Sequence, residues 1–187
     1  MFTRLSQALD RLAARSNMIV FGLLFLITFF IFIPSASRRI EQASGQPADL
    51  LDMRLAYTPA QAQSVFDALG EAGRDAYAHF SMSADLVFPL VYGLLFSTGL
   101  VYLYRPSLVE HPARFSPVFL PLLAMLFDYL ENFTLVACLA NYPTPDPLML
   151  QAASLFTTTK WAFQAATFAA AAWGLYQLLR SRRAARR

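Results

Sequence analysis

Four long apolar stretches constrain this 187-residue chain more than any other feature. They cover residues 18–34, 84–104, 115–142 and 152–179, and the first has an uncharged core, MIVFGLLFLITFFIFI. A helix rises about 1.5 Å per residue, so about 20 apolar residues cross a hydrocarbon core of about 30 Å. In lipid the backbone must pair with itself, which makes each stretch an expected helix. We therefore predict an all-α polytopic membrane protein, a four-transmembrane-helix bundle.

The composition fits this fold and excludes several other classes. Hydrophobic residues make up 57% of the chain and charged residues 14%, whereas soluble domains have about 45–50% and about 25%. A soluble enzyme and a nucleic-acid-binding protein are therefore excluded. One cysteine, Cys138, cannot form an internal disulfide. We expect no metal or cofactor, because a haem between helices needs histidines in the spans, and His79 and His111 lie outside them.

The placement of the arginines predicts the orientation of the chain. Ten arginines precede the first span, lie in the connection 105–114 or follow the fourth span, and four lie in the connection 35–83. The connection 143–151 has none. Basic residues favour the cytoplasmic side of a membrane, so both termini, including the basic tail 180–187, are expected in the cytoplasm.

Residues 1–17 carry the pattern of an interfacial helix. Their apolar residues share one helical face and their arginines lie elsewhere, which predicts a helix on the cytoplasmic surface of the membrane. A cleaved signal peptide over residues 1–37 is the competing interpretation, but the apolar stretch is longer than a usual signal core. The apolar face consists of Phe2, Leu5, Leu9 and Leu12.

The connection 35–83 has helix signals of its own. Thr58 and Gln61 form a capping box around Pro59, and Gly70 is a typical helix end, so a helix is expected over residues 59–69. Further helical turns are expected over residues 71–80. This extracytoplasmic cap would either seal the bundle or act as a lid or docking surface for an outer partner. The apolar face of its first helix consists of Ala62, Val65, Phe66 and Leu69.

Two segments carry a resemblance to a known group of proteins. They are LDMRLAYTPAQAQSVFDALGEAGRDAY, before the second span, and FDYLENF, in the third. With the span between them they resemble an uncharacterised family of small bacterial four-helix inner-membrane proteins. The resemblance covers most of residues 50–165 and implies the same topology in a bacterial inner membrane. It implies no activity and no catalytic residue.

Four ionisable side chains lie within or at the edge of the spans. Asp128 and Glu131 belong to the third span, and Asp85 and Lys160 lie near the outer ends of the second and fourth. At about 1.5 Å per residue all four fall in the outer half of the membrane. Ionisable residues in a span usually face the bundle interior, so we expect them to converge, with Lys160 reaching Glu131 or Asp128.

Helical spacing places further polar residues on the same faces. Asn132 lies one turn after Asp128, and Tyr92 lies two turns after Asp85. This constellation is either a binding site for a proton, ion or polar ligand, or a structural network that fixes helix register while Asp85 and Lys160 reach interfacial water. The candidate residues are Asp85, Tyr92, Asp128, Glu131, Asn132, Lys160, Gln164 and Thr167.

Three functional hypotheses follow. The first is a non-enzymatic accessory protein that binds a membrane partner or lipid in the outer leaflet, favoured by the lack of HExxH, GxSxG and phosphate-loop motifs. The second is a small proton- or ion-coupled transporter that uses Asp128, Glu131 and Lys160, although no internal repeat is visible. The third is a membrane enzyme that acts on a lipid or isoprenoid substrate through Asp85, Asp128 and Glu131.

Overall fold

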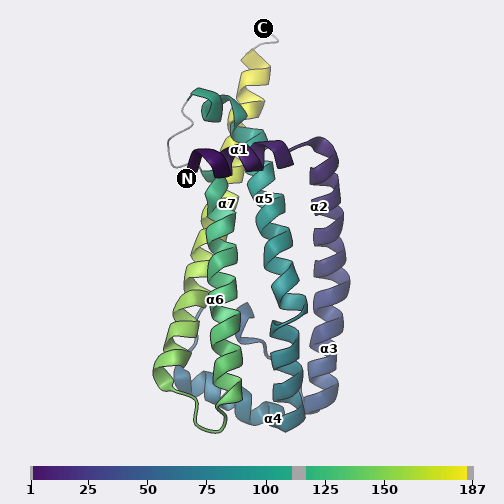
Figure 1. The fold of residues 1–187 in the computed structure, drawn as a ribbon, viewed down its shortest axis with the longest axis vertical. Coiled ribbons are helices and arrows are strands. Elements are labelled where there is room, and N and C mark those ends of the chain that lie inside the picture. The colour runs from purple at the N-terminus through teal and green to yellow at the C-terminus, as the bar shows by residue number, and fades with distance from the viewer. Residues whose placement is uncertain (1, 111–116, 185–187) are drawn as a thin grey trace.

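The computed structural model describes residues 2–110 and 117–184, and every regular element in these ranges is a helix (Figure 1). The predicted all-α class is confirmed. In chain order the elements are α1 (Phe2–Leu12), α2 (Arg15–Ile27), η1 (Thr28–Phe32), α3 (Ile33–Ser44), η2 (Leu51–Met53), α4 (Pro59–Ser81), α5 (Ala84–Glu110), η3 (Pro117–Phe119), α6 (Leu120–Ala140) and α7 (Pro147–Ala184).

Three helical stretches in the described residues are long and apolar enough to cross a membrane. They are Arg15–Ser44, Pro59–Arg105 and Pro117–Ala140. The fourth predicted span, 152–179, lies within α7, which is 38 residues long but is not one of the three. α7 is rich in alanine, which is only weakly apolar, and it also carries Lys160 and Gln164. Its length exceeds that of a bilayer crossing, while its average hydropathy is lower than that of the others.

The first span continues past its expected end at residue 34. α2, η1 and α3 follow one another without a break from Arg15 to Ser44. η1 is a π-helical turn that ends two residues before Pro34 and includes Phe30, the residue four positions before that proline. A proline in a helix has no N–H to donate to the carbonyl four residues earlier, and a local change of helical pitch accommodates that missing bond. Residues 35–44 of the expected connection are therefore helical.

The ends of α5 and α7 also shift outward, whereas α6 ends at Ala140, before the expected end of the third span at residue 142. α5 continues to Glu110, beyond the expected end at residue 104, and α7 continues to Ala184, into the predicted tail 180–187. The rest of the predicted connection 105–114, which includes His111 and Arg114, lies outside the described residues, as do residues 115–116 of the third span and residues 185–187. Helices that carry few breakers continue until the chain turns, so apolar composition alone marks their ends too early.

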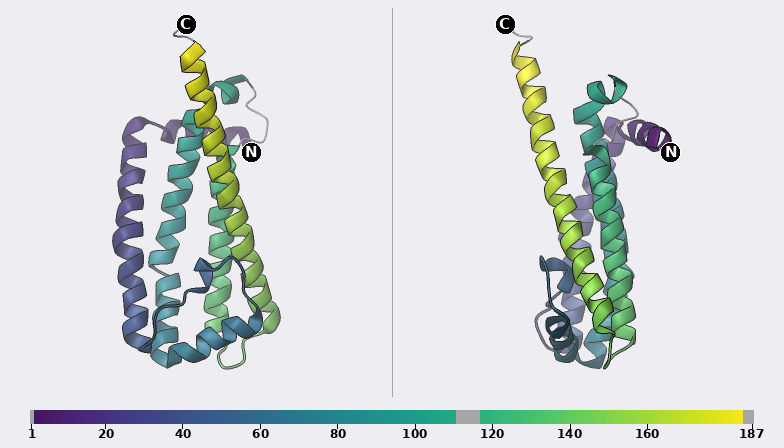
Figure 2. Two further views of the ribbon diagram at one scale, coloured as in Figure 1. Left: turned by 180° about the vertical axis from the view of Figure 1, so that it is seen from behind. Right: turned by 90° about the vertical axis from the view of Figure 1, so that its left-hand side faces the viewer.

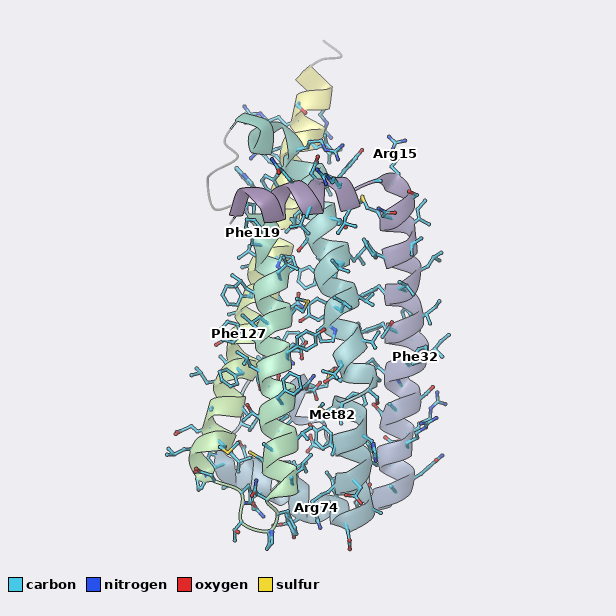
Figure 3. All side chains as sticks on the ribbon, viewed as in Figure 1. Arg15, Phe32, Arg74, Met82, Phe119 and Phe127 are labelled. Carbon is cyan, nitrogen blue, oxygen red and sulfur yellow. The ribbon has the colours of Figure 1, made fainter. Side chains whose placement is uncertain are left out.

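Both termini lie at the same end of the bundle, and α1 runs across that end roughly perpendicular to the long helices (Figure 1). Leu9 and Ala13 are buried there in a small core with Leu100 and Val118. Figure 3 shows Arg15 beside α1 and Arg74 at the opposite end. The last turns of α7 project beyond the other helices at the end that holds the termini (Figure 2).

The opposite end is covered by α4, whose start follows the sequence prediction. The Gln61 N–H donates to Thr58 Oγ1 at 3.2 Å, and the Thr58 N–H donates to Gln61 Oε1 at 2.8 Å. All four residues of the predicted apolar face are buried. Gly70, with φ 63° and ψ −179°, joins two helical segments. The first segment lies across the end of the bundle, and the second leads into α5 (Figure 1).

The connection between α3 and α4, residues 45–58, does not stay on the outer surface. It turns back along the long helices and carries η2 to the level of the bundle interior (Figure 2). Leu50, Leu51 and Tyr57 from this segment are buried in the larger core, together with Phe66 of α4 and Leu135 of α6. We call residues 45–58 the return loop.

Candidate buried polar site

A cluster of buried polar side chains lies where α5, α6, α7 and the return loop meet. Its α6 members, Asp128, Glu131 and Asn132, follow i, i+3 and i+4 spacing, so one helix face presents all three. Each member of the cluster is at most 7% exposed. The polar cluster consists of Asp52, Asp85, Tyr92, Asp128, Glu131, Asn132, Thr157 and Lys160.

Lys160 lies at the centre of this cluster. Its Nζ atom lies 2.8 Å from Glu131 Oε2 and 3.4 Å from Asp128 Oδ1. It also donates to the backbone carbonyl of Asp52 at 3.2 Å. An ammonium group has three N–H donors and no acceptor, so three oxygens match its capacity. The predicted contact of Lys160 with Glu131 or Asp128 is confirmed, and both acids take part.

Glu131 is fully buried and holds α6 against α7 through both of its oxygens. Oε2 forms the ion pair with Lys160, and Oε1 accepts a hydrogen bond of 2.5 Å from the Thr157 hydroxyl. The same hydroxyl lies 3.0 Å from the Ala153 carbonyl of its own helix. Hydrogen bonds to an ionised group are roughly twice as strong as those between neutral groups. Thr157 therefore helps to keep the Glu131 carboxyl group in place.

A second set of contacts joins α5 to α6. The Tyr92 hydroxyl donates to Asp128 Oδ2 at 2.9 Å, and Asn132 Nδ2 donates to the Asp85 carbonyl at 2.9 Å. Outside the cluster, the Tyr129 hydroxyl donates to the Leu86 carbonyl at 2.9 Å. Asp128 thus accepts from Tyr92 of α5 and pairs with Lys160 of α7. This one carboxyl group links all three long helices.

The return loop is attached to the cluster through a backbone atom. The Asp52 carbonyl accepts from Lys160 Nζ and, at 3.3 Å, from Trp161 Nε1. Three further bonds hold the loop against α4 and α7. The Leu51 N–H donates to the Tyr77 hydroxyl at 2.9 Å, and the Tyr57 N–H donates to Ser154 Oγ at 2.9 Å. The Thr158 hydroxyl donates to the Leu55 carbonyl at 2.9 Å. These contacts tie the return loop to the inside of the bundle.

Sequence reasoning missed Asp52 and the return loop. Asp52 lies between the expected first span and the capping box, where a polar residue normally faces water. Its carboxyl group is buried, and this burial raises the pKa of Asp52 while the positive charge of Lys160 lowers it by a smaller amount. The one signal in the sequence is the preceding apolar pair, Leu50 and Leu51, both of which are buried.

Two of the predicted site residues, Gln164 and Thr167, are not members of the polar cluster. Thr167 donates to the Phe163 carbonyl of its own helix at 2.8 Å and lines an apolar pocket of about 430 Å³ with Phe96 and Leu100. Gln164 lies near the Tyr92 hydroxyl, and its Oε1 is buried without a hydrogen-bond partner in the described part of the chain. Of the three candidates on α7, Lys160 therefore lies in the cluster, whereas Thr167 lies nearer the end that holds the termini.

The cluster holds more acids than bases. Asp52, Asp85, Asp128 and Glu131 face one cation, Lys160. Asp52 Oδ1 and Asp85 Oδ2 are buried without a hydrogen-bond partner among the described residues. With every group charged, the cluster would carry three uncompensated negative charges away from water, which is strongly unfavourable. Charge balance therefore requires bound protons or a bound cation.

The described residues contain no group of three or more His, Cys, Asp or Glu side chains arranged to hold a metal ion. Two acids of the cluster, Glu131 and Asp128, pair with the Lys160 ammonium group through their side chains. Cys138 is buried in the larger core among apolar residues. The contacts that the cluster shows are ion pairs and hydrogen bonds.

Comparison with known proteins gives no relative from which a function could be transferred. No protein-family model, no curated protein and no solved structure matches the chain. The family resemblance of residues 50–165 stays a prediction. The geometry of the polar cluster and the positions of the helices are therefore the observations that bear on function.

Proposed function

We propose that the chain crosses a bacterial inner membrane four times, with both termini in the cytoplasm and α4 on the opposite side. Three apolar helical stretches support a membrane location. Both termini lie at one end of the bundle, as an even number of crossings requires (Figure 1). The length of α7, about 57 Å at 1.5 Å per residue, supports a fourth crossing. The excess of arginines at that end supports its cytoplasmic orientation.

We further propose that the protein is a non-enzymatic accessory protein that binds a lipid or a membrane partner in the outer leaflet. One observation carries the non-enzymatic part: three protein oxygens, on Glu131, Asp128 and Asp52, lie within 3.4 Å of Lys160 Nζ. A cation used in this way joins α6, α7 and the return loop, which supports a structural use of its charge.

Lipid retention tests the binding part of this proposal. The full chain is purified in a mild detergent and analysed by native mass spectrometry. We expect bound phospholipid to survive extraction, because a specific lipid dissociates more slowly than the lipids that merely surround a helix. Complete loss of phospholipid, with a folded protein, would remove the support for a lipid-binding role.

A second candidate is a proton-coupled carrier, favoured by the excess of acids in the cluster. The buried, unpartnered oxygens of Asp52 and Asp85 offer acceptors for protons. Proteoliposomes with an internal pH-sensitive dye separate the two candidates. An accessory protein gives no proton uptake under an imposed potential.

Uptake that is lost in Asp128→Asn but kept in Asp10→Asn would favour the carrier. Asp10 is a suitable control because it pairs with Arg105 at the other end of the bundle, at 3.0 Å, and is half exposed.

A further inference from the structure

A second site lies at the outer end of the bundle, apart from the polar cluster. It is a pocket of about 270 Å³ between α3 and the last turns of α4, with Ser83 from the connection to α5. A water molecule occupies about 30 Å³ of liquid, so the pocket has room for a group of several non-hydrogen atoms. Its lining residues are Ala36, Arg39, Ala76, His79, Phe80 and Ser83.

The depth of this pocket matches the headgroup layer of a bilayer. Residues 36 and 39 lie about 3–8 Å beyond residue 34, the predicted outer end of the first span. Ser83 directly precedes α5, which carries the second span. The hydrocarbon core is about 30 Å thick and the whole bilayer about 40–45 Å, so each headgroup layer is about 5–8 Å thick. Both walls of the pocket therefore reach the level of lipid phosphates.

The lining combines two basic side chains with an apolar wall. Arg39 and His79 are exposed, and neither takes part in an ion pair between described residues. A guanidinium group offers a planar fork of donors that matches a phosphate, and an imidazole ring offers at least one N–H in either protonation state. The Ser83 hydroxyl already donates to the His79 carbonyl at 2.5 Å. The donors available to a ligand are those of Arg39 and His79.

We propose that this pocket binds the phosphate group of an outer-leaflet phospholipid. Arg39 and His79 donate to the phosphate oxygens, and Ala36, Ala76 and Phe80 contact the glycerol and the start of an acyl chain. Pockets that present basic residues at this depth are suited to anionic headgroups. The inference rests on the proposed function, because it gives the lipid-binding protein its lipid site.

A titration with phosphatidylglycerol tests the proposal. The full chain in detergent is mixed with increasing amounts of this lipid, and native mass spectrometry measures the fraction of protein with one lipid bound. We expect Arg39→Gln and His79→Gln each to weaken binding about fivefold, which corresponds to about 1 kcal/mol for one basic contact. Both side chains are exposed, so the variants should fold like the wild type.

Arg38→Gln is the matched control. Arg38 is the neighbour of Arg39 and equally basic, but it does not line the pocket, and its Nε donates to the Pro34 carbonyl of its own helix at 3.3 Å. We expect this variant to bind as the wild type does. Equally weakened lipid binding in Arg38→Gln and Arg39→Gln would overturn the assignment of the site to this pocket. It would attribute the binding to the general positive charge of the surface.

Further measurements distinguish lipid phosphate from free phosphate, and binding in this pocket from lipid binding elsewhere on the protein. Inorganic phosphate that binds in place of the lipid and is lost in Arg39→Gln, without any lipid binding, would overturn the lipid assignment. A wild-type protein that binds phosphatidylglycerol with no loss in either pocket variant would overturn this site and leave the proposed function intact. A wild-type protein that binds no phospholipid would overturn both this site and the lipid-binding part of the proposed function.

Discussion

Lys160 is the residue on which the balance of buried charge depends. It is 5% exposed, and it pairs with two acids whose side chains are also buried. Taking such charges out of water is unfavourable, and their mutual attraction offsets this only while both partners are present. The same residue fixes the return loop through a backbone carbonyl. Removal of its charge should therefore affect both the helix contacts and the loop.

Replacement of this lysine tests that dependence. We expect Lys160→Met to lower the free energy of unfolding by about 3–5 kcal/mol, because Glu131 and Asp128 lose their counter-charge while remaining buried. The measurement is thermal or denaturant unfolding in detergent. Arg105→Gln is the control: it breaks an exposed pair with Asp10, and such pairs contribute about 0–1 kcal/mol. Similar stability of the two variants would contradict the role given to Lys160.

The buried carboxyl group of Asp52 predicts that the stability of the folded protein depends on pH. Because burial raises the pKa of Asp52 above its ordinary value of 3.8, the folded protein binds this proton more tightly than the unfolded chain does. That stabilisation is fully present below pH 3.8 and is lost as the pH rises through the folded pKa. Asp52→Asn cannot lose a proton, and it keeps the carbonyl that anchors the return loop.

We therefore expect Asp52→Asn to become more stable than the wild type as the pH rises from about 4 toward neutrality. Unfolding of both proteins across this pH range measures the difference. Asp49→Asn is the control, because the Asp49 side chain is more than half exposed and pairs with Arg54 at the surface. A difference between Asp52→Asn and the wild type that does not change with pH would contradict the raised pKa of the buried Asp52 carboxyl group.

At the scale of elements, local signals and the positions of ionisable residues in the apolar stretches were reliable, whereas the path of a long connection was not. The start of α4 was predictable because the capping box of Thr58 and Gln61 is a contact between near neighbours. The convergence of Asp128, Glu131 and Lys160 was predictable because ionisable residues in an apolar helix usually face the bundle interior and pair with one another. The path of the return loop was not, because it depends on bonds to Tyr77, Ser154 and Lys160, far away in the chain.

Gly70 lets α4 change direction and gives a test of this element. Its φ of 63° with ψ of −179° suits glycine, and an added Cβ would meet nothing within 4 Å. We expect Gly70→Ala to lower stability by about 1–3 kcal/mol through backbone strain alone. Gly22→Ala, at a helical position with the same open surroundings, should be neutral or stabilising by up to about 1 kcal/mol. Unfolding in detergent that gives equal values for both would contradict the role of Gly70.

At the scale of the whole molecule, the proposed topology makes α4 and the loop between α6 and α7 extracytoplasmic. Single cysteines in a Cys138→Ser background test it in intact cells with a membrane-impermeant maleimide. We expect labelling at Gln46→Cys and Thr144→Cys, and none at Ser181→Cys until the membrane is opened. All three positions are exposed, so their accessibility depends on the membrane. If Ser181→Cys were the one variant labelled in intact cells, the result would contradict the proposed orientation and indicate the opposite one.

The length of α7 also gives it a mechanical property. Lys160 fixes the helix near the return loop, and a second contact fixes it further along, where the Tyr104 hydroxyl donates to the Ala170 carbonyl at 2.8 Å. About 21 Å of continuous helix separates Ala170 from residue 184. The displacement of the free end of a rod grows with its length, so a tilt of about 5° at Ala170 would move the arginine-bearing end by about 2 Å. The position of these arginines therefore depends on how firmly α7 is held at both contacts.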